Sequence, residues 1–124
     1  MLTDIRSHIR VSGVNDDIVF RLFKKVTKFS LKYKIKIVDV YILIVVGKIN
    51  RVGLSRFGGC YVPADLTSVT HQTLLPTETV RRRLVVLREL ELIDRVGKGY
   101  FIFNWSAWEE AARLIEEEPT HAKS

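Results

Sequence analysis

The sequence contains very little cysteine and no segment suited to crossing a membrane. Its 124 residues include one cysteine, Cys60, which excludes an intrachain disulfide and a metal site built from cysteines. The first residues, MLTDIRSHIRVSG, lack the apolar core of a signal peptide. The apolar run 37–46 is too short to span a bilayer and carries Asp39. These absences predict a cytoplasmic protein without a membrane partner.

Residues suited to catalysis or metal binding are few and scattered. The three histidines, His8, His71 and His121, show no metal-ligand spacing, and no context for a Ser-His-Asp triad is visible. The segment Gly97-Lys98-Gly99 is too short for a phosphate loop and does not precede a helix. We therefore expect no enzyme, no cofactor and no metal site.

Positive charge is in excess. Lysine and arginine number 20 against 14 acidic residues, a formal net charge of +6, and 47% of the residues are hydrophobic. The length and composition fit one globular domain with its own core. The charge favours an anionic partner, either nucleic acid or an acidic membrane surface, although a basic protein without such a partner fits equally well.

The first predicted helix covers 18–33, with Asn15 or Asp16 as its N-cap. At about 100° per residue, one face carries Ile18, Val19, Leu22, Phe23, Val26, Phe29 and Tyr33, and lysines and an arginine occupy the opposite side. Phe20 and Leu31 widen the apolar face beyond the needs of one packing partner. A second copy of the chain is the simplest additional partner.

The segment 35–49 is ambiguous. Its Ile and Val residues favour a strand, whereas its length and its all-round apolar character suit a buried helix. We interpret it as a helix from about Val38 to Asn50. Residues 51–62 should then form a loop with a Gly58–Gly59 turn and a short strand at Tyr61 and Val62.

The second half predicts short helices and a hairpin. We expect a helix over 63–72 that starts with Pro63, a turn over 73–78 and a helix over 77–92. Strands over 93–96 and 100–103 should follow, joined by a Gly97-Lys98-Gly99 turn. In the last helix Ser106 and Glu109 should form a capping box, and the helix should end at Pro119. Trp105 and Trp108 should pack this last helix on the core.

Two short helices followed by a hairpin are typical of a winged helix-turn-helix. We therefore predict a mainly α fold with a small β-hairpin wing and extra helices at both ends. The chain should form a single winged-helix domain, 1–124, made of an N-terminal helix (14–34), a winged core (37–104) and a C-terminal helix (105–118).

Three consecutive arginines lie in the segment TETVRRRLVVL, 77–87. With Val80 at the centre of the core face, Leu84 and Leu87 fall close to it, and Arg81 and Arg82 point outward. Arg83 lies at the margin of the core, where its stem can pack while its charged head reaches water.

The stretch 76–102 resembles the recognition helix and wing of bacterial GntR-type regulators. The matching residues are Thr79, Val80, Arg81, Leu84, Leu87, Leu92, Ile93, Gly97, Gly99 and Phe101. Pro76, Thr77 and Glu78 replace the family's Ser-Arg-Thr, and Arg83 and Glu91 replace its Ala and Gly. The small layout with flanking helices is similar to MarR-type regulators, which dimerise through their terminal helices. The resemblance implies a winged-helix regulator and carries a DNA-contact role to Arg81 and, more weakly, to Thr79.

We therefore expect a DNA-binding transcriptional regulator that acts as a homodimer on a palindromic site. Its predicted contacts with double-stranded DNA are Glu78, Thr79, Arg81 and Arg82 in the major groove, Arg95 and Lys98 on the wing, and Thr67, Ser68 and Thr77 at phosphates. Its predicted dimer interface consists of Phe20, Phe23, Leu31, Trp108 and Ile115. The alternative is a winged helix used only as a protein-interaction module. The sequence does not identify an operator or a small-molecule effector.

Overall fold

The structure is a computed structural model that describes residues 16–56 and 58–122. These residues form the helices α2 (Asp16–Tyr33), α3 (Ile37–Arg56), α4 (Leu66–Thr73), α5 (Thr77–Glu89) and α6 (Trp105–Ala122), and the strands β1 (Ala64–Asp65), β2 (Ile93–Val96) and β3 (Gly99–Ile102). The fold is mainly helical with a small antiparallel sheet, as the sequence predicts. The predicted irregular segment 1–13 and the candidate cap Asn15 lie outside the described residues.

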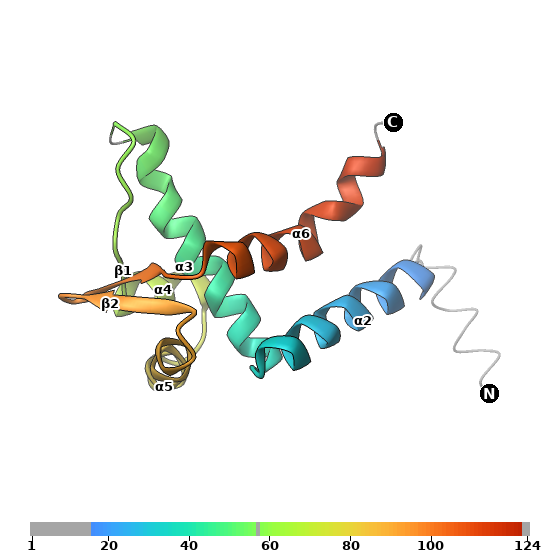
Figure 1. The fold of residues 1–124 in the computed structure, drawn as a ribbon, viewed down its shortest axis with the longest axis horizontal. Helices are drawn as coiled ribbons and strands as arrows, with labels where there is room; N and C mark the ends of the chain where they lie inside the picture. Colours follow the sequence, from blue (N-terminus) through green and yellow to red (C-terminus); the bar gives the residue numbers. More distant parts are fainter. Residues whose placement is uncertain (1–15, 57, 123–124) are drawn as a thin grey trace.

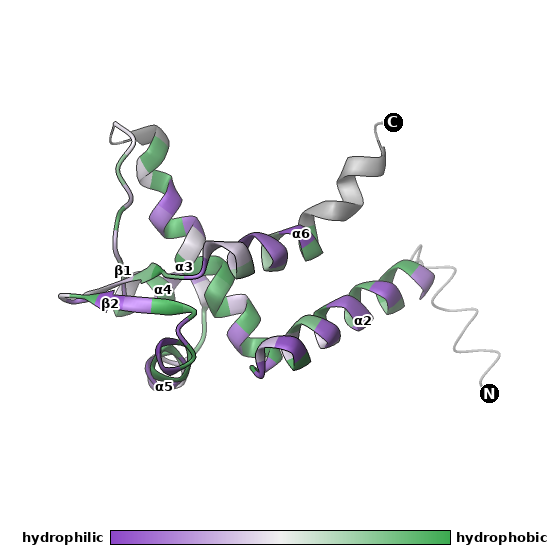
Figure 2. Cartoon of the chain, viewed as in Figure 1, coloured by the Kyte–Doolittle hydropathy of each residue, from purple (hydrophilic) through white to green (hydrophobic). Residues whose placement is uncertain are grey.

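Helix α3 forms the centre of the molecule. It contacts α2, α4, α5, α6 and the strand β3, and Ile42, Leu43 and Val46 are completely buried. Figure 1 shows α3 passing between the hairpin and the two outer helices, and Figure 2 shows that the N-terminal half of α3 is mostly hydrophobic. Because α3 is covered on several sides, its sequence is apolar all round, and the helical interpretation of 35–49 is confirmed.

Helix α3 continues six residues beyond Asn50, so the prediction of a loop from residue 51 is wrong. The sequence interpretation treated Gly53 as a loop residue. In the structure Gly53 is a helical residue at a close backbone contact, since a Cβ there would lie 2.1 Å from the carbonyl oxygen of Cys60. The returning chain thus packs directly against the helix, which requires glycine at this position.

The side chain of Asn50 joins α3 to the sheet. It is completely buried, its Nδ2 donates to the carbonyl oxygens of Val62 and Tyr100 at 2.7 and 3.0 Å, and its Oδ1 accepts the N–H of Ile102 at 2.9 Å. Both amide protons and the oxygen therefore have partners, which removes the cost of burying a polar group.

The third strand differs from the predicted one. The sheet has the order β1-β3-β2, and Ala64 pairs with Tyr100, whereas Tyr61 and Val62 are not in a strand. Pro63 precedes β1 instead of starting a helix, because it packs against Gly99, where a Cβ would lie 2.3 Å from the Pro63 Cβ.

The turn between β2 and β3 is shorter than predicted. Val96 pairs with Gly99, so Gly97 and Lys98 form a two-residue turn, and Phe103 lies outside β3. Gly97 has a φ of 63° at the first turn position, where a type II′ hairpin turn favours glycine.

Helix α6 begins and ends differently from the prediction. Its cap is Asn104, whose Oδ1 accepts the N–H of Ala107 at 3.0 Å, and not Ser106. The helix continues past Pro119 to Ala122. Figure 1 shows that α6 bends along its length.

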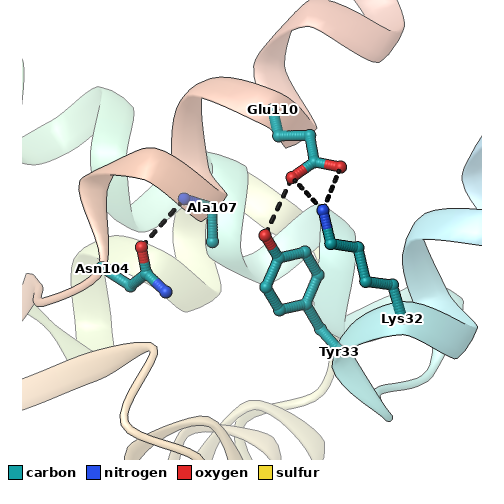
Figure 3. Close-up of polar contacts among 5 residues, drawn as sticks. All are labelled: Lys32, Tyr33, Asn104, Ala107 and Glu110. Atoms are coloured by element: carbon teal, nitrogen blue, oxygen red, sulfur yellow. Dashed lines mark hydrogen bonds and ion pairs between the residues drawn. The ribbon is translucent and has the colours of Figure 1, made fainter.

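Helices α2 and α6 meet near the C-terminal end of α2 (Figure 3). Glu110 accepts hydrogen bonds from the Tyr33 hydroxyl at 2.8 Å and from Lys32 Nζ at 3.2 Å. Burial and the hydrogen bond to Glu110 raise the pKa of Tyr33, so its hydroxyl remains a donor at neutral pH. The two helices extend from this contact as separate arms (Figure 1).

Candidate nucleic-acid interface

Helices α4 and α5 form a short helical pair joined by a tight turn. Asp65 caps α4, since its Oδ1 accepts the N–H of Ser68 at 2.8 Å, and this bond lowers the pKa of Asp65. The helix therefore begins at Leu66, not at Pro63. Leu74 ends it with a φ of 62°, and Pro76 precedes the first residue of α5.

The buried and exposed sides of α5 agree with the helical spacing. Val80, Leu84 and Leu87 are completely buried, whereas Arg81 and Arg82 are exposed. The helix ends at Glu89, three residues before the predicted end. An outward basic surface on α5 is thus a property of the structure as well as of the sequence.

The two outward arginines differ in their partners. Arg81 Nη1 lies 2.5 Å from Glu78 Oε1, and both side chains are more than half exposed. Arg82 forms no ion pair with any residue that the structure describes. An exposed pair within one helix contributes little stability, so Glu78 can hold Arg81 in position without preventing its exchange to another acceptor.

Arg83 lies at the margin of the core, as predicted, and its side chain is 19% exposed, but its charged head binds a buried carboxylate, which the sequence did not predict. Its Nε and Nη2 donate to the two carboxylate oxygens of Asp39 at 2.6 and 2.7 Å. Asp39 is completely buried, and its hydrogen bonds raise the pKa of Arg83 above the ordinary value. The sequence carried a signal for this pair, namely an acid inside the apolar run 37–46 and an arginine at a core margin, because a buried charge needs a partner.

The hairpin carries two of the predicted contact residues. Lys98 is exposed in the turn, and Arg95 is exposed on β2. The Arg95 Nε donates to the Gly97 carbonyl at 3.1 Å, and its guanidinium lies 5.8 Å from the centre of the Tyr100 ring. Figure 1 shows the hairpin beside α5 and pointing away from the free ends of α2 and α6.

The remaining predicted contacts lie on α4 and at the start of α5. Thr67 and Thr77 are exposed, and Ser68 and Thr79 are half-buried. The Ser68 N–H and the Ser68 side chain both form hydrogen bonds with the Asp65 carboxylate, so Ser68 is part of the cap of α4. The structure therefore brings the predicted contacts onto three adjacent elements, α4, α5 and the hairpin.

The predicted dimer residues divide into two groups. Phe20, Phe23, Leu31 and Ile115 are 62%, 59%, 73% and 58% exposed. Trp108 is only 6% exposed, its Nε1 donates to the Ile44 carbonyl at 3.2 Å, and it packs edge-on against Trp105. Its assignment to a dimer interface is wrong, because its apolar surface is used inside its own chain.

Side chains that could ligate a metal ion do not form a metal-binding group in the described part of the chain. Residues 16–56 and 58–122 contain no group of three or more His, Cys, Asp and Glu side chains arranged to hold a metal ion. His71 and Cys60 are exposed, and His8 lies outside these ranges. None of the helices within them is both long and apolar enough to cross a membrane.

No protein-family model, curated protein or solved structure matches this chain.

Proposed function

We propose that the protein is a winged helix-turn-helix transcriptional regulator that binds double-stranded DNA. The observation that carries this proposal is the order α4, tight turn, α5 and hairpin, with Arg81 and Arg82 exposed on α5 and Lys98 exposed at the hairpin tip. In a helix-turn-helix the second helix enters the major groove and its first turns meet the base edges. Arginine in that position can bind guanine or phosphate with two hydrogen bonds.

The proposed roles follow from position and exposure. Arg81 and Arg82, with Glu78 and Thr79, face the bases from α5. Lys98 and Arg95 meet the backbone or the minor groove from the hairpin. Thr67, Ser68 and Thr77 contact phosphates.

A homodimer is part of the proposal. One recognition helix reads only a few base pairs, and a symmetric pair reads two half-sites about one helical turn apart. The exposed Phe20, Phe23 and Leu31 on α2 and Ile115 on α6 support these two arms as the joint between copies. The arms extend away from the hairpin, so a joint there leaves both hairpins free (Figure 1).

The test is binding of a duplex selected from random sequence, followed by fluorescence anisotropy at a series of salt concentrations. If the dimer neutralises about six phosphates, log K falls against log salt with a slope near −5. Absence of binding at low salt, or binding indifferent to salt, would reject the proposal. The exposed apolar surface of α2 would then favour the second candidate, a protein-interaction module.

Substitutions separate base reading from positioning. Arg81→Ala should cost about 1–3 kcal/mol on the selected site and relax its sequence preference, whereas Lys98→Ala should weaken binding to all sequences alike. Arg113→Ala is a matched control, since this exposed arginine on α6 also has an acid within its own helix, Glu109 at 3.9 Å. It should leave binding unchanged. Equal, sequence-independent losses in Arg81→Ala and Lys98→Ala would contradict base reading by Arg81.

A further inference from the structure

The carboxylate of Asp39 contacts both α5, which the proposed function places on DNA, and the connection to α2, which it places at the dimer joint. Both of its oxygens bind Arg83 on α5, at 2.6 and 2.7 Å. A two-point contact between a planar guanidinium and a planar carboxylate fixes their relative direction as well as their distance. Asp39 is completely buried and lies in the first turn of α3, so the middle of α5 is fixed to the start of α3.

The same carboxylate also fixes the corner from which α2 departs. Asp39 Oδ2 accepts the N–H of Lys36 at 2.8 Å, and Lys36 is the last residue before α3. At the end of α2, Lys34 has a φ of 59°, and the N–H of Ile35 donates to the Ser30 carbonyl at 3.0 Å. These two features define the turn between α2 and α3. Asp39 therefore holds both α5 and the short connection that sets the direction of α2.

We propose that Asp39 and Arg83 are positioning residues that couple the direction of the α2 arm to the orientation of α5. In a dimer joined through α2, this coupling sets the separation of the two α5 helices and hence the spacing of the half-sites that the protein accepts. This consequence for DNA rests on the proposed function, whereas the coupling between the helices does not.

The geometric reason for the coupling is that the completely buried carboxylate of Asp39 has few alternative partners. If α2 and its corner rotate relative to α5, either the Lys36 bond or the two-point contact with Arg83 must break. Loss of the Arg83 contact leaves the buried carboxylate of Asp39 without its charged partner, which is strongly unfavourable, and loss of the Lys36 bond removes one of its hydrogen bonds. A displaced arm therefore moves α5 with it.

The coupling is tested without DNA by measuring the distance between spin labels on α2 and α5. Labels at Thr27→Cys and Glu89→Cys, both exposed positions, are introduced with Cys60→Ser and measured by electron–electron double resonance. We expect one narrow distance distribution in the otherwise unchanged protein. Arg83→Lys, which keeps the charge but loses the planar fork, should broaden it at least about twofold.

A second variant is included in case Arg83→Lys fails to fold. The double change Asp39→Asn/Arg83→Gln removes both charges, so no unpaired charge is left in the interior, and it should fold while also broadening the distribution. Arg88→Lys is the matched control on α5, since Arg88 is exposed, and it should leave the distribution narrow. If both pair variants fold, by circular dichroism and thermal melting, and keep the narrow distribution, the coupling is rejected.

The consequence for DNA is measured with two copies of the selected half-site at centre-to-centre spacings around one helical turn. The unchanged protein should prefer one spacing by about tenfold, and the pair variants should bind all spacings within about threefold of one another while remaining dimers. A protein that shows the coupling between labels but binds no DNA overturns the proposed function alone. A protein that binds DNA with the same spacing preference in all variants overturns the coupling.

Discussion

Among residues 16–56 and 58–122, three non-glycine residues adopt left-handed backbone conformations, and each lies at the end of a helix. They are Lys34 after α2, Leu74 after α4 and Glu91 after α5, with φ of 59°, 62° and 61°. At Glu91 the geometry is a Schellman motif, because the N–H of Leu92 donates to the Leu87 carbonyl at 3.0 Å and that of Glu91 to the Arg88 carbonyl at 2.9 Å. Such positions favour glycine, which has no Cβ to clash with the following carbonyl.

Glu91→Gly should therefore raise the free energy of unfolding. Relief of the left-handed conformation is worth about 1–2 kcal/mol, and the added freedom of glycine in the unfolded chain removes part of that gain, which leaves about 0.5–1 kcal/mol. Urea unfolding measures the difference. Glu91→Ala is the matched control, since it removes the same charge but keeps the Cβ. Equal stabilities of the Gly and Ala variants would contradict the role of backbone strain.

The cap at Asp65 should make stability depend on pH in the acid range. Its pKa is lowered from 3.8 by the Ser68 N–H, so its contribution is complete above that value and is lost as the pH falls through the lower pKa of the folded state. Asp65→Ala should cost about 1 kcal/mol at pH 7 through loss of the cap. The difference in the free energy of unfolding between the two proteins should narrow as the pH falls below about 4. A difference that stays constant as the pH falls would contradict the role of the charged carboxylate.

Helix packing in this chain depends on where small residues meet large ones. Helices α3 and α6 cross where Gly47 faces Trp108, and a Cβ at Gly47 would lie 1.9 Å from Trp108 Nε1. The indole is held there by its hydrogen bond to the Ile44 carbonyl and by Arg51, whose guanidinium lies 5.1 Å from the ring centre. The close crossing of the two helices thus requires glycine at position 47.

Gly47→Ala should destabilise the protein, although alanine is the better helix former. The gain in helix propensity is about 1 kcal/mol, whereas forcing a methyl group against a fixed indole costs about 1–3 kcal/mol or more. We expect a net loss in thermal unfolding. In a Trp108→Leu background the same change should cost less, because the clashing ring is absent. A loss of the same size in both backgrounds would show that the two residues are not coupled.

At the scale of the whole molecule, the two outer helices expose apolar surface that the other described residues leave uncovered. Phe29 is the buried residue of α2, while Phe20, Phe23 and Leu31 face solvent on the same helix. Burial of each such side chain between copies would contribute roughly 1.5–3 kcal/mol. This surface, together with Ile115 on α6, is the basis of the proposed dimer.

The double variant Phe20→Glu/Leu31→Glu should convert the dimer to a monomer. Light scattering at tens of micromolar measures the mass of the wild type and the variant. Phe103→Glu is the matched control, since Phe103 is 63% exposed against 62% for Phe20 but follows the hairpin. It should remain a dimer. A monomeric wild type, or a double variant that stays dimeric, would contradict this interface.

The local spacing of apolar residues and glycines in the sequence by itself determined most of the helices and strands. The apolar spacing of 18–33 predicted α2, the spacing of Val80, Leu84 and Leu87 predicted the buried side of α5, and the glycines at 97 and 99 predicted the hairpin. These features depend on residues a few positions apart, where helical and strand periods act directly. The exposed positions of Arg81, Arg82 and Lys98 in the candidate site followed from the same local spacing.

The tertiary structure alone decided the features that join distant segments. Asp39 and Arg83 are 44 positions apart, and Asn50 binds the carbonyl of Tyr100, 50 positions away. Gly53 continues α3 because the returning chain packs on it, and Trp108 is buried because Gly47 makes room for it. The helical and strand periods of the sequence do not predict such contacts, since they depend on which faces of the helices and strands pack together after folding. That is the physical reason why the pairing of Arg83 with buried Asp39 was not predicted, and why Trp108 was predicted at an interface although it is buried in its own chain.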